Sequence, residues 1–227
     1  MAGNHFRFGI WFLGLCAAVY AHSSAAQSST SQSSAAQFSV AQFSVAQSSV
    51  AQFSVAQSSA AEQSTAEGRA TVDRLLNALK AAPDEQAAAG LESQLEQTWL
   101  RAGSPAVTLL LSRGLRSLQA GQDDEAQEAF SDAITLQPDV GEAWHQRALA
   151  RYHAGDVNGA IRDLQETVHL EPRNFLAFRT LANIATARED WKGAYSAWQK
   201  VMELDPKTPG GEERLRLLKR RAVGEDT

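Results

Sequence analysis

From Arg69 onward, apolar residues recur at intervals of three and four, the spacing of one buried face of an α-helix. Glycines and prolines fall where these stretches end, as is usual at helix termini. They are Pro83, Gly103 to Pro105, Gly121, Pro138, Gly155, Pro172, Pro206 and Pro209 to Gly211. The pattern predicts an all-α fold built from consecutive helices.

The helical part repeats itself every 34 residues. Four sets of residues share this spacing: Pro138, Pro172 and Pro206; Ala126, Ala160 and Ala194; Leu136, Leu170 and Leu204; Leu110, Trp144 and Phe178. Four sets in one register define three tandem units, 107–140, 141–174 and 175–208.

These units resemble tetratricopeptide (TPR) repeats over 102 of the 227 residues. In the second unit, Trp144 opens a first helix, Gly155 marks the turn, Ala160 and Leu164 pack the second helix, and Pro172 follows its end. The resemblance implies a helical-hairpin solenoid whose first helices line a concave groove.

The spacing has a physical reason. Ala126, Ala160 and Ala194 are small where two helices approach closely, and the large Phe130, Leu164 and Trp198 fill the adjacent space. Departures from the family pattern are Arg113-Gly114, Arg147-Ala148, Ser117, Arg151, Thr167, Glu189 and Val201. The resemblance implies that an arginine at the place of Arg113 packs its stem and keeps its charged head in solvent.

Helices are also predicted on both sides of the units. Within 69–104, Thr71–Lys80 and Asp84–Arg101 form an antiparallel pair that would cover the first repeat, as a cap or a worn fourth unit. Within 209–227, Glu212–Arg221 begins with acids and ends with bases, which complements the helix dipole and predicts a capping helix. Its basic end is alternatively a contact for anionic lipid or for a partner.

Residues 1–26 have the layout of a secretory signal peptide, with Arg7 before a 14-residue apolar run and small residues after it. The leading prediction is cleavage before Gln27, with Ser23 as a second site, and a periplasmic or secreted bacterial protein. An uncleaved anchor is the alternative, but a membrane span needs about 20 apolar residues. Leu15 before Cys16 argues against a lipoprotein.

Residues 27–68 form a low-complexity Ala/Gln/Ser/Val linker. Glutamine recurs every five residues from Gln27 to Gln57, and no charge occurs between Gln27 and Ala61. A period of five fits neither a helix nor a strand, so the segment is predicted to be a disordered tether. The alternative is a pentapeptide-repeat β-helix, in which Phe38, Phe43 and Phe53 would point inward.

The charge balance and the motifs narrow the function classes. A net charge of −5 argues against nucleic acid and anionic lipid as partners, and one cysteine excludes a disulfide scaffold. The sequence has no phosphate loop, dinucleotide motif or nucleophile elbow. His145, His153 and His169 lack the spacing of a zinc site. We therefore predict no enzyme activity, no metal and no cofactor.

The resemblance implies which residues face the groove. They are Thr108, Leu111 and Leu115 in the first unit, Glu142, His145, Gln146, Leu149, Tyr152 and His153 in the second, and Arg179, Asn183 and Thr186 in the third. Arg179 and Asn183 match one half of the family's carboxylate clamp. Leu111 and Leu115 stand where the other half needs polar groups, so binding of a chaperone's carboxyl terminus is disfavoured.

The predicted function is a protein-interaction adaptor that binds a peptide or a partner helix and supports assembly of an envelope complex. The alternatives are a self-associating structural protein and a subunit of an envelope enzyme. His145 and His153 in the groove would make binding pH-sensitive. Nothing in the sequence sets the oligomeric state or names the partner.

Overall fold

The computed structural model describes residues 66–224, which are helical apart from short turns and contain no strand. The helices are residues 66–80, α2 (Glu85–Leu100), α3 (Pro105–Gln119), α4 (Asp123–Leu136), α5 (Gly141–His153), α6 (Val157–Leu170), α7 (Phe175–Ala187), α8 (Trp191–Leu204) and α9 (Gly211–Val223). The predicted signal peptide lies outside the described residues, as does the linker up to residue 65. Residues 66–68, assigned to the linker from the sequence, are already helical.

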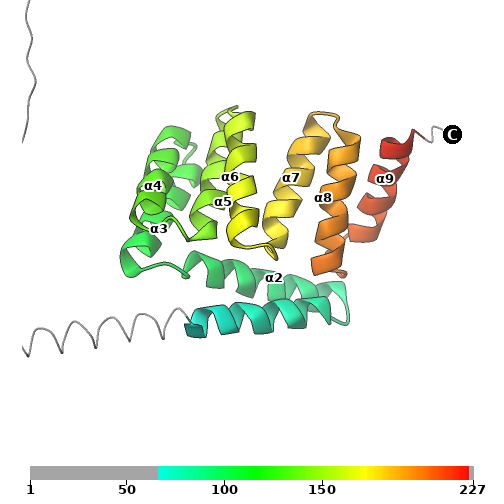
Figure 1. Ribbon diagram of the computed structural model, residues 1–227, viewed down its shortest axis with the longest axis horizontal. Helices are drawn as coiled ribbons and strands as arrows, with labels where there is room; N and C mark the ends of the chain where they lie inside the picture. The colour runs from blue at the N-terminus through cyan, green and yellow to red at the C-terminus, as the bar shows by residue number, and fades with distance from the viewer. Residues whose placement is uncertain (1–65, 225–227) are drawn as a thin grey trace, which may run out of the picture. The chain divides into compact units, whose positions relative to one another are not determined.

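Helices α3 to α8 form three antiparallel hairpins that stand side by side (Figure 1). Each hairpin coincides with one 34-residue unit, and each packs against the next in chain order. The predicted all-α helical-hairpin solenoid is therefore confirmed.

Within each hairpin, a small residue faces a large one. Ala126, Ala160 and Ala194 are fully buried, and Phe130, Leu164 and Trp198 are at most 3% exposed. The hairpins are further fixed by their helix caps, since Asp156 and Asp190 each accept a hydrogen bond from the backbone N–H three residues on.

The second helix of every hairpin ends two residues before a proline. The last helical residues are Leu136, Leu170 and Leu204, and the next residue in each case has extended backbone angles. A residue before proline is disfavoured in the helical region, so Pro138, Pro172 and Pro206 stop the helices in the same register. The chain then turns into the next first helix.

The turn inside each hairpin needs a left-handed residue. Gly121 and Gly155 have φ of 72° and 86° in the first two hairpins, and Glu189 has φ of 59° in the third. Glutamate is strained in this region because of its Cβ, whereas glycine is not. The departure at Glu189 keeps the turn but at an energetic cost.

Arg147, which is equivalent to Arg113 in the next repeat, does not keep its head in solvent. Its guanidinium donates two hydrogen bonds of 2.8 Å to Asp163 and one of 3.2 Å to Ser131. It also lies 4.9 Å above the ring of Trp144. Asp163 is 2% exposed, and its buried charge is matched by Arg147 and by Arg151 at 2.8 Å, so these two arginines join α5 to α6. Arg113 is exposed, as expected.

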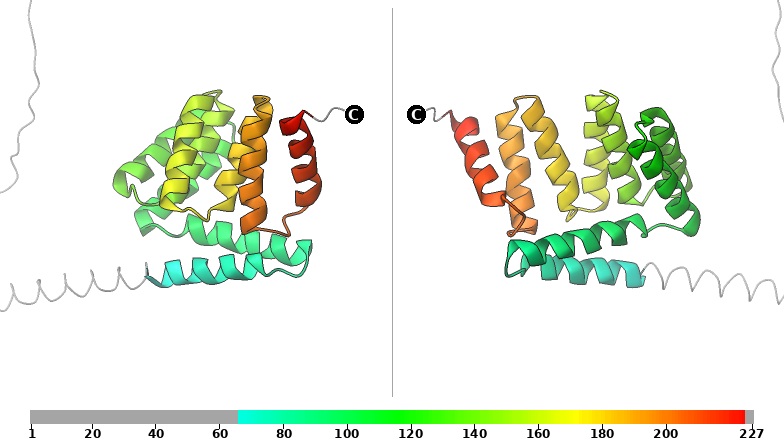
Figure 2. Two further views of the ribbon diagram at one scale, coloured as in Figure 1. Left: turned by 45° about the vertical axis from the view of Figure 1, so that its right-hand side comes forward. Right: turned by 180° about the vertical axis from the view of Figure 1, so that it is seen from behind.

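The N-terminal helical pair, meaning residues 66–80 together with α2, does not cover the first repeat as expected. Its apolar side chains, including Leu95 and Trp99, form one cluster with Phe175 and Leu176 of α7 and Leu204 of α8. Figures 1 and 2 show α2 and residues 66–80 running along the edge of the array at which α5, α7 and α9 begin. The stripe of apolar residues on α2 predicted burial of that face but not the surface that buries it.

Helix α9 packs against α8 and ends the array as the predicted capping helix. Leu218 is buried in the cluster that contains Trp198, and the Nε1 of Trp198 donates a hydrogen bond to the carbonyl of Gly211. Two of its arginines lie over aromatic rings: Arg214 is 4.2 Å from Trp198, and Arg221 is 5.4 Å from Trp191. The basic side of α9 is thus partly used for packing.

Candidate functional site

The first-helix face, meaning the side of the array lined by α3, α5 and α7, contains the twelve predicted groove residues. The structure divides them by exposure. Buried are Leu111, Glu142, His145 and Gln146; half-buried are Thr108, Leu115, Leu149, Tyr152, Arg179 and Thr186; exposed are His153 and Asn183. The groove residues in the early turns of α5 are therefore inaccessible to a partner, whereas His153 in its last turn is accessible.

The buried part is a polar cluster in the first two turns of α5. Gln146 donates a hydrogen bond of 2.5 Å to Glu142, and the Nδ1 of His145 lies 3.5 Å from the same carboxylate oxygen. The Nε2 of His145 is 3.3 Å from the hydroxyl of Thr180 on α7. His145 is only 4% exposed while His153 is exposed, so the structure does not bring the two histidines together in one open groove.

Arg179, half of the predicted clamp, already holds a carboxylate of the same chain. Its Nη1 lies 2.8 Å from the Oε2 of Glu92 on α2, and the other oxygen of Glu92 accepts a hydrogen bond of 3.2 Å from Thr208. The side chain of Glu92 is 14% exposed. The N-terminal helical pair thus occupies the position at which an acidic ligand of Arg179 would bind.

A second arginine reaches this site from α9. Arg214 donates a hydrogen bond of 2.5 Å to the side-chain oxygen of Asn183. Burial, together with the charge of Arg179 nearby, lowers the pKa of Arg214 from its ordinary value. The sequence predicts no fourth repeat that could place a basic side chain beside Arg179 and Asn183. Helix α9 places Arg214 at that position instead.

One residue from each repeat meets the N-terminal segments. Gln137, Glu171 and Asp205 are equivalent in the 34-residue register, just before the three prolines. Gln137 accepts a hydrogen bond of 3.0 Å from the backbone N–H of Ser104. Burial raises the pKa of Glu171, and the charge of Arg69 opposes this shift. The loops between repeats therefore form an edge along which the N-terminal helical pair lies.

At the third position of this edge, two carboxyl groups meet. The pKa of Asp205 is raised to about 7, chiefly by burial and then by a hydrogen bond with Glu92 and the charge of that residue. The hydroxyl of Thr208 and the backbone of Lys207 act in the opposite direction. Asp205 is fully buried, so a proton shared with Glu92 relieves a repulsion that water does not screen.

Several buried polar atoms have no hydrogen-bond partner among residues 66–224. They include Trp99 Nε1, Glu142 Oε2 and Asn174 Nδ2. A buried polar atom without a partner costs about 1–3 kcal/mol. They lie on α2, in the first turn of α5 and directly before α7.

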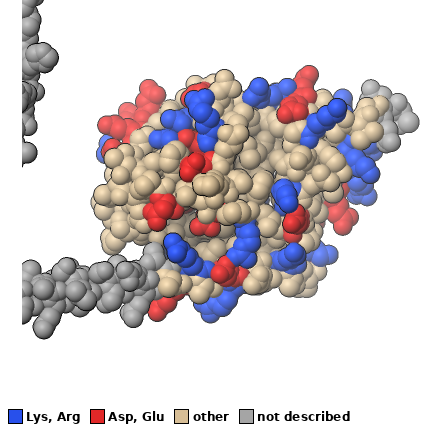
Figure 3. Space-filling model, in the orientation of Figure 1, with Lys and Arg blue, Asp and Glu red and all other residues tan. Residues whose placement is uncertain are grey.

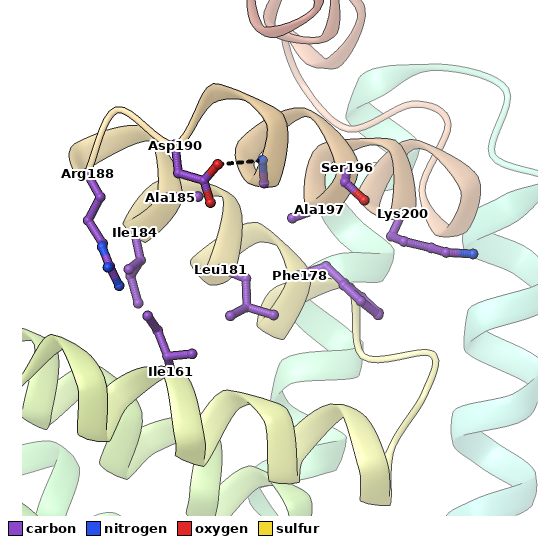
Figure 4. Close-up of a pocket in the computed structure, with 11 residues that line it drawn as sticks. Ile161, Phe178, Leu181, Ile184, Ala185, Arg188, Asp190, Ser196, Ala197 and Lys200 are labelled. Atoms are coloured by element: carbon purple, nitrogen blue, oxygen red, sulfur yellow. Dashed lines mark hydrogen bonds between the residues drawn. The ribbon is translucent and has the colours of Figure 1, made fainter. Parts of the chain in front are cut away.

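A separate pocket of about 400 Å³ lies between α6 and the α7–α8 hairpin (Figure 4). Ile161, Leu181 and Ile184 point into it, while Arg188 and Lys200 stand at its borders. Asp190 at its upper side caps α8 through the backbone N–H of Gly193 and is not free to act on a ligand. The pocket is mainly apolar and marks an incomplete contact between the second and third repeats.

The surface has no single-sign field on the side shown in Figure 3, where acidic and basic side chains are interspersed. Among residues 66–224, no group of three or more His, Cys, Asp or Glu side chains could hold a metal ion. No helix in the same range has the length and apolar character to span a bilayer.

Two functional residues were missed in the sequence. Glu92 stands between Leu91 and Leu95 on the apolar face of α2, and a charge at such a place signals a cationic partner. Arg214 was counted with the basic residues of a cap. Its signal was weaker, because α9 lacks the repeat register that aligns Arg179 and Asn183 with the first-helix face.

No protein-family model matches the chain. A TPR repeat-containing protein of Rhizobium etli is 24% identical over 156 residues, which are 69% of this chain and 76% of that protein. Tetratricopeptide repeat protein 36 of Mus musculus is 45% identical over 58 residues, 26% of this chain and 31% of that protein. The chain thus spans about a third of the mouse protein's length.

A similar solved structure is the first TPR of Spaghetti (RPAP3) bound to an HSP90 peptide. It has a TM-score of 0.50 and 20% sequence identity, and the match covers 53% of this chain and 98% of that one. At this identity the likeness concerns the fold. The described helices and these relatives define the class: an α-helical solenoid of 34-residue hairpins.

The described helices have the fold of a tetratricopeptide repeat array, and the chain is similar in sequence to proteins named for this repeat.

Proposed function

We propose that this protein is a non-catalytic adaptor that binds a peptide or a helix of a partner protein on its first-helix face. The observation that carries the proposal is the opening of this face at the last turns of α5 and α7, where His153 and Asn183 are exposed and Tyr152 is half-buried. His153 and Tyr152 offer hydrogen bonds and an aromatic contact, and the amide nitrogen of Asn183 can donate while its oxygen accepts from Arg214.

The relatives support this proposal. The solved TPR of Spaghetti holds an HSP90 peptide, and a Triticum aestivum relative, 29% identical over 112 residues, is named an Hsp70-Hsp90 organizing protein. Both names describe recognition of other proteins. For this chain, we carry over binding of a polypeptide and leave the chaperone tails aside, because Leu111 and Leu115 remain at the places of the second half of the clamp.

The proposal is tested by photo-cross-linking the full chain in its native cells and comparing two double variants. His153→Ala with Asn183→Ala changes exposed side chains of the first-helix face, and Arg162→Ala with Gln165→Ala changes exposed side chains of α6. We expect the first variant to lose its cross-linked partners and the second to keep them. Equal capture by both variants would contradict binding on the first-helix face.

We further propose that the chain is exported and that its partners belong to an envelope complex. Support comes from the charge, apolar and small-residue regions of residues 1–26. Cell fractionation followed by sequencing of the mature amino terminus is the test. A mature chain that begins at Gln27 outside the cytoplasm is expected, and an intact chain in the cytoplasm would contradict export.

A self-associating structural protein is the second candidate, favoured by the position of the exposed apolar side chains. Leu109 and Leu136 on the first repeat are 67% and 55% exposed, and Leu217 and Val223 on α9 are 47% and 63% exposed. Because the two ends of the array each expose apolar residues, copies could stack end to end. Sedimentation at increasing concentration, with Leu109→Ser and Leu217→Ser as disrupting variants, tests this candidate.

A further inference from the structure

Helix α2 is bound to the array as a ligand helix would be. Glu92 supplies a carboxylate to Arg179 at 2.8 Å and accepts a hydrogen bond from Thr208. Three and seven residues further along the same face, Leu95 is fully buried and Trp99 is 2% exposed. The ring of Trp99 lies 5.9 Å from that of Phe175 at the start of α7.

We propose that the N-terminal helical pair is an exchangeable occupant of the edge at which α5 and α7 begin, next to Arg179 of the first-helix face, and that this edge accepts a partner helix with the chemistry of α2. Such a helix carries a carboxylate followed, three and seven residues later, by large apolar side chains. This inference rests on the proposed function and adds the chemistry of the partner and the element that competes with it.

Two unmatched polar groups at the docking cluster favour exchange. Trp99 Nε1 on α2 and Asn174 Nδ2, directly before Phe175 of the same cluster, are buried without a partner among the described residues. The carboxyl group of Asp205 forms a hydrogen bond with Glu92 that needs a proton on one of the two groups, so this contact of α2 is lost when the proton leaves. A helix that brings a donor or an acceptor to these atoms would bind better than α2 does.

Most of the apolar side chains in this cluster belong to the N-terminal helical pair, so the two helices can stay packed together after they separate from the array. Leu76, Leu79, Ala82 and Ala88 belong to the pair itself, whereas the array contributes Phe175, Leu176 and Leu204 to the cluster. Much of this core is therefore internal to the pair. The pair can separate from the array as a folded hairpin while it stays tethered through the short link into α3.

The positive charge of Arg179 and Arg214 determines that the partner helix carries a negative charge at this position. Arg179 and Arg214 approach each other closely enough for the charge of one to lower the pKa of the other. A carboxylate placed between them relieves this repulsion, as Glu92 does for Arg179. A neutral or basic helix would leave two partly buried arginines opposed, so the partner helix is acidic at this position.

The test uses the full chain and a fluorescent peptide with the sequence of residues 84–101. Four proteins are compared: the natural chain, Glu92→Arg, Glu96→Arg, and the double variant Glu92→Arg with Arg179→Glu. Glu96 is the matched control because it is an exposed glutamate on the same helix. Fluorescence anisotropy measures peptide binding, and hydrogen exchange reports on residues 142–146 and 175–180.

We expect Glu92→Arg to bind the peptide at least tenfold more tightly than the natural chain and to exchange faster in both segments. Glu96→Arg should behave as the natural chain does, and the double variant should regain slow exchange because its ion pair is restored with reversed signs. If Glu92→Arg lowers the helix content, Glu92→Gln replaces it with the same expected direction.

Two results would overturn the inference. Unchanged exchange in Glu92→Arg, with peptide binding as weak as in the natural chain, means that the pair is a permanent part of the fold. Faster exchange without peptide binding means that the chemistry of α2 does not describe the partner. A failure of the proposed function is seen separately, since partner capture depends on His153 and Asn183 while the peptide comes from this chain.

Discussion

Gly114 on α3 lies directly against the ring of Phe130 on α4, and a Cβ at this glycine would overlap three atoms of the ring. The other two hairpins carry Ala148 and Ala182 at the equivalent place, opposite Leu164 and Trp198. The size of the residue on the first helix thus matches the shape of its large neighbour on the second. Glycine is required in the first hairpin because a phenylalanine ring fills the gap.

Substitution of this glycine should destabilise the protein. Gly114→Ala forces the ring of fully buried Phe130 to move, which we expect to lower the free energy of unfolding by about 1–3 kcal/mol. Gly90→Ala on α2 is the matched control, since a Cβ there meets no atom, and helix propensity should raise stability by up to about 1 kcal/mol. Urea unfolding measures the change in the free energy of unfolding for both variants. An unchanged free energy of unfolding in Gly114→Ala would contradict the close contact.

The third hairpin turn should be improved by glycine. Glu189 has φ of 59°, where the first two hairpins have Gly121 and Gly155. We expect Glu189→Gly to stabilise the protein by about 0.5–1 kcal/mol, because the relief of strain exceeds the added freedom of the unfolded chain. Gly155→Glu should have the opposite effect. Thermal unfolding measures both, and a destabilised Glu189→Gly would show that the glutamate has a compensating contact.

The ion pair between α5 and α6 should be sensitive to loss of its acid. Asp163 contacts Arg147 and also Arg151 at 2.8 Å, and its side chain is 3% exposed. Removal of a buried partner leaves uncompensated charge, so Asp163→Ala should cost about 3–5 kcal/mol. Glu203→Ala, which breaks the exposed pair with Lys200, should change stability by less than about 1 kcal/mol. Similar costs for the two variants, measured by urea unfolding, would contradict this difference.

Docking of the N-terminal helical pair should weaken as the pH rises. The pKa of Asp205 is about 7 in the folded chain, against an ordinary value of 3.8. The folded state therefore holds a proton that the unfolded state releases between about pH 4 and 7. Stability contributed by this proton is complete below pH 4, falls as the pH rises to about 7, and is absent above it.

The groups around Asp205 define the control for this pH dependence. Glu92 on α2 faces it, Arg179 on α7 holds Glu92, and the hydroxyl of Thr208 lies beside both. We expect the urea midpoint of the natural chain to fall between pH 5 and pH 8 by more than that of Asp205→Asn, which cannot ionise. Equal changes in the two proteins would assign the pH dependence to other groups.

The sequence predicted the hairpins well because their determinants are local. Pro138, Pro172 and Pro206 end helices through the backbone of the preceding residue, and Ala160 with Leu164 defines a helix contact within 34 residues. The docking of α2 onto the start of α7 could not be predicted in this way. An apolar stripe such as Leu91, Leu95 and Trp99 shows that a face is buried, but the surface that buries it lies about 80 residues away.

The candidate site also contains residues that are far apart in the sequence, so its composition could not be predicted from the repeat positions. Arg179 and Asn183 were expected to bind a partner through their repeat positions, but their neighbours Glu92 and Arg214 come from helices outside the repeat register. Position in a repeat predicts orientation within a hairpin. It does not predict which distant segment of the chain reaches that hairpin, because that depends on tertiary packing.

The position of Glu92 also changes how the array should fold. In a simple solenoid each unit touches only its neighbours, so terminal units can fray independently. Here the contacts of Glu92 with Arg179 and Thr208 join residues 87 and 116 positions apart, and Glu85 reaches the backbone of Gly210 across 125. These contacts close the chain from α2 to the end of the third repeat. While the pair is docked, the three hairpins and α2 should therefore melt in a single cooperative transition, with a slower approach to the native state than the helical content alone would suggest.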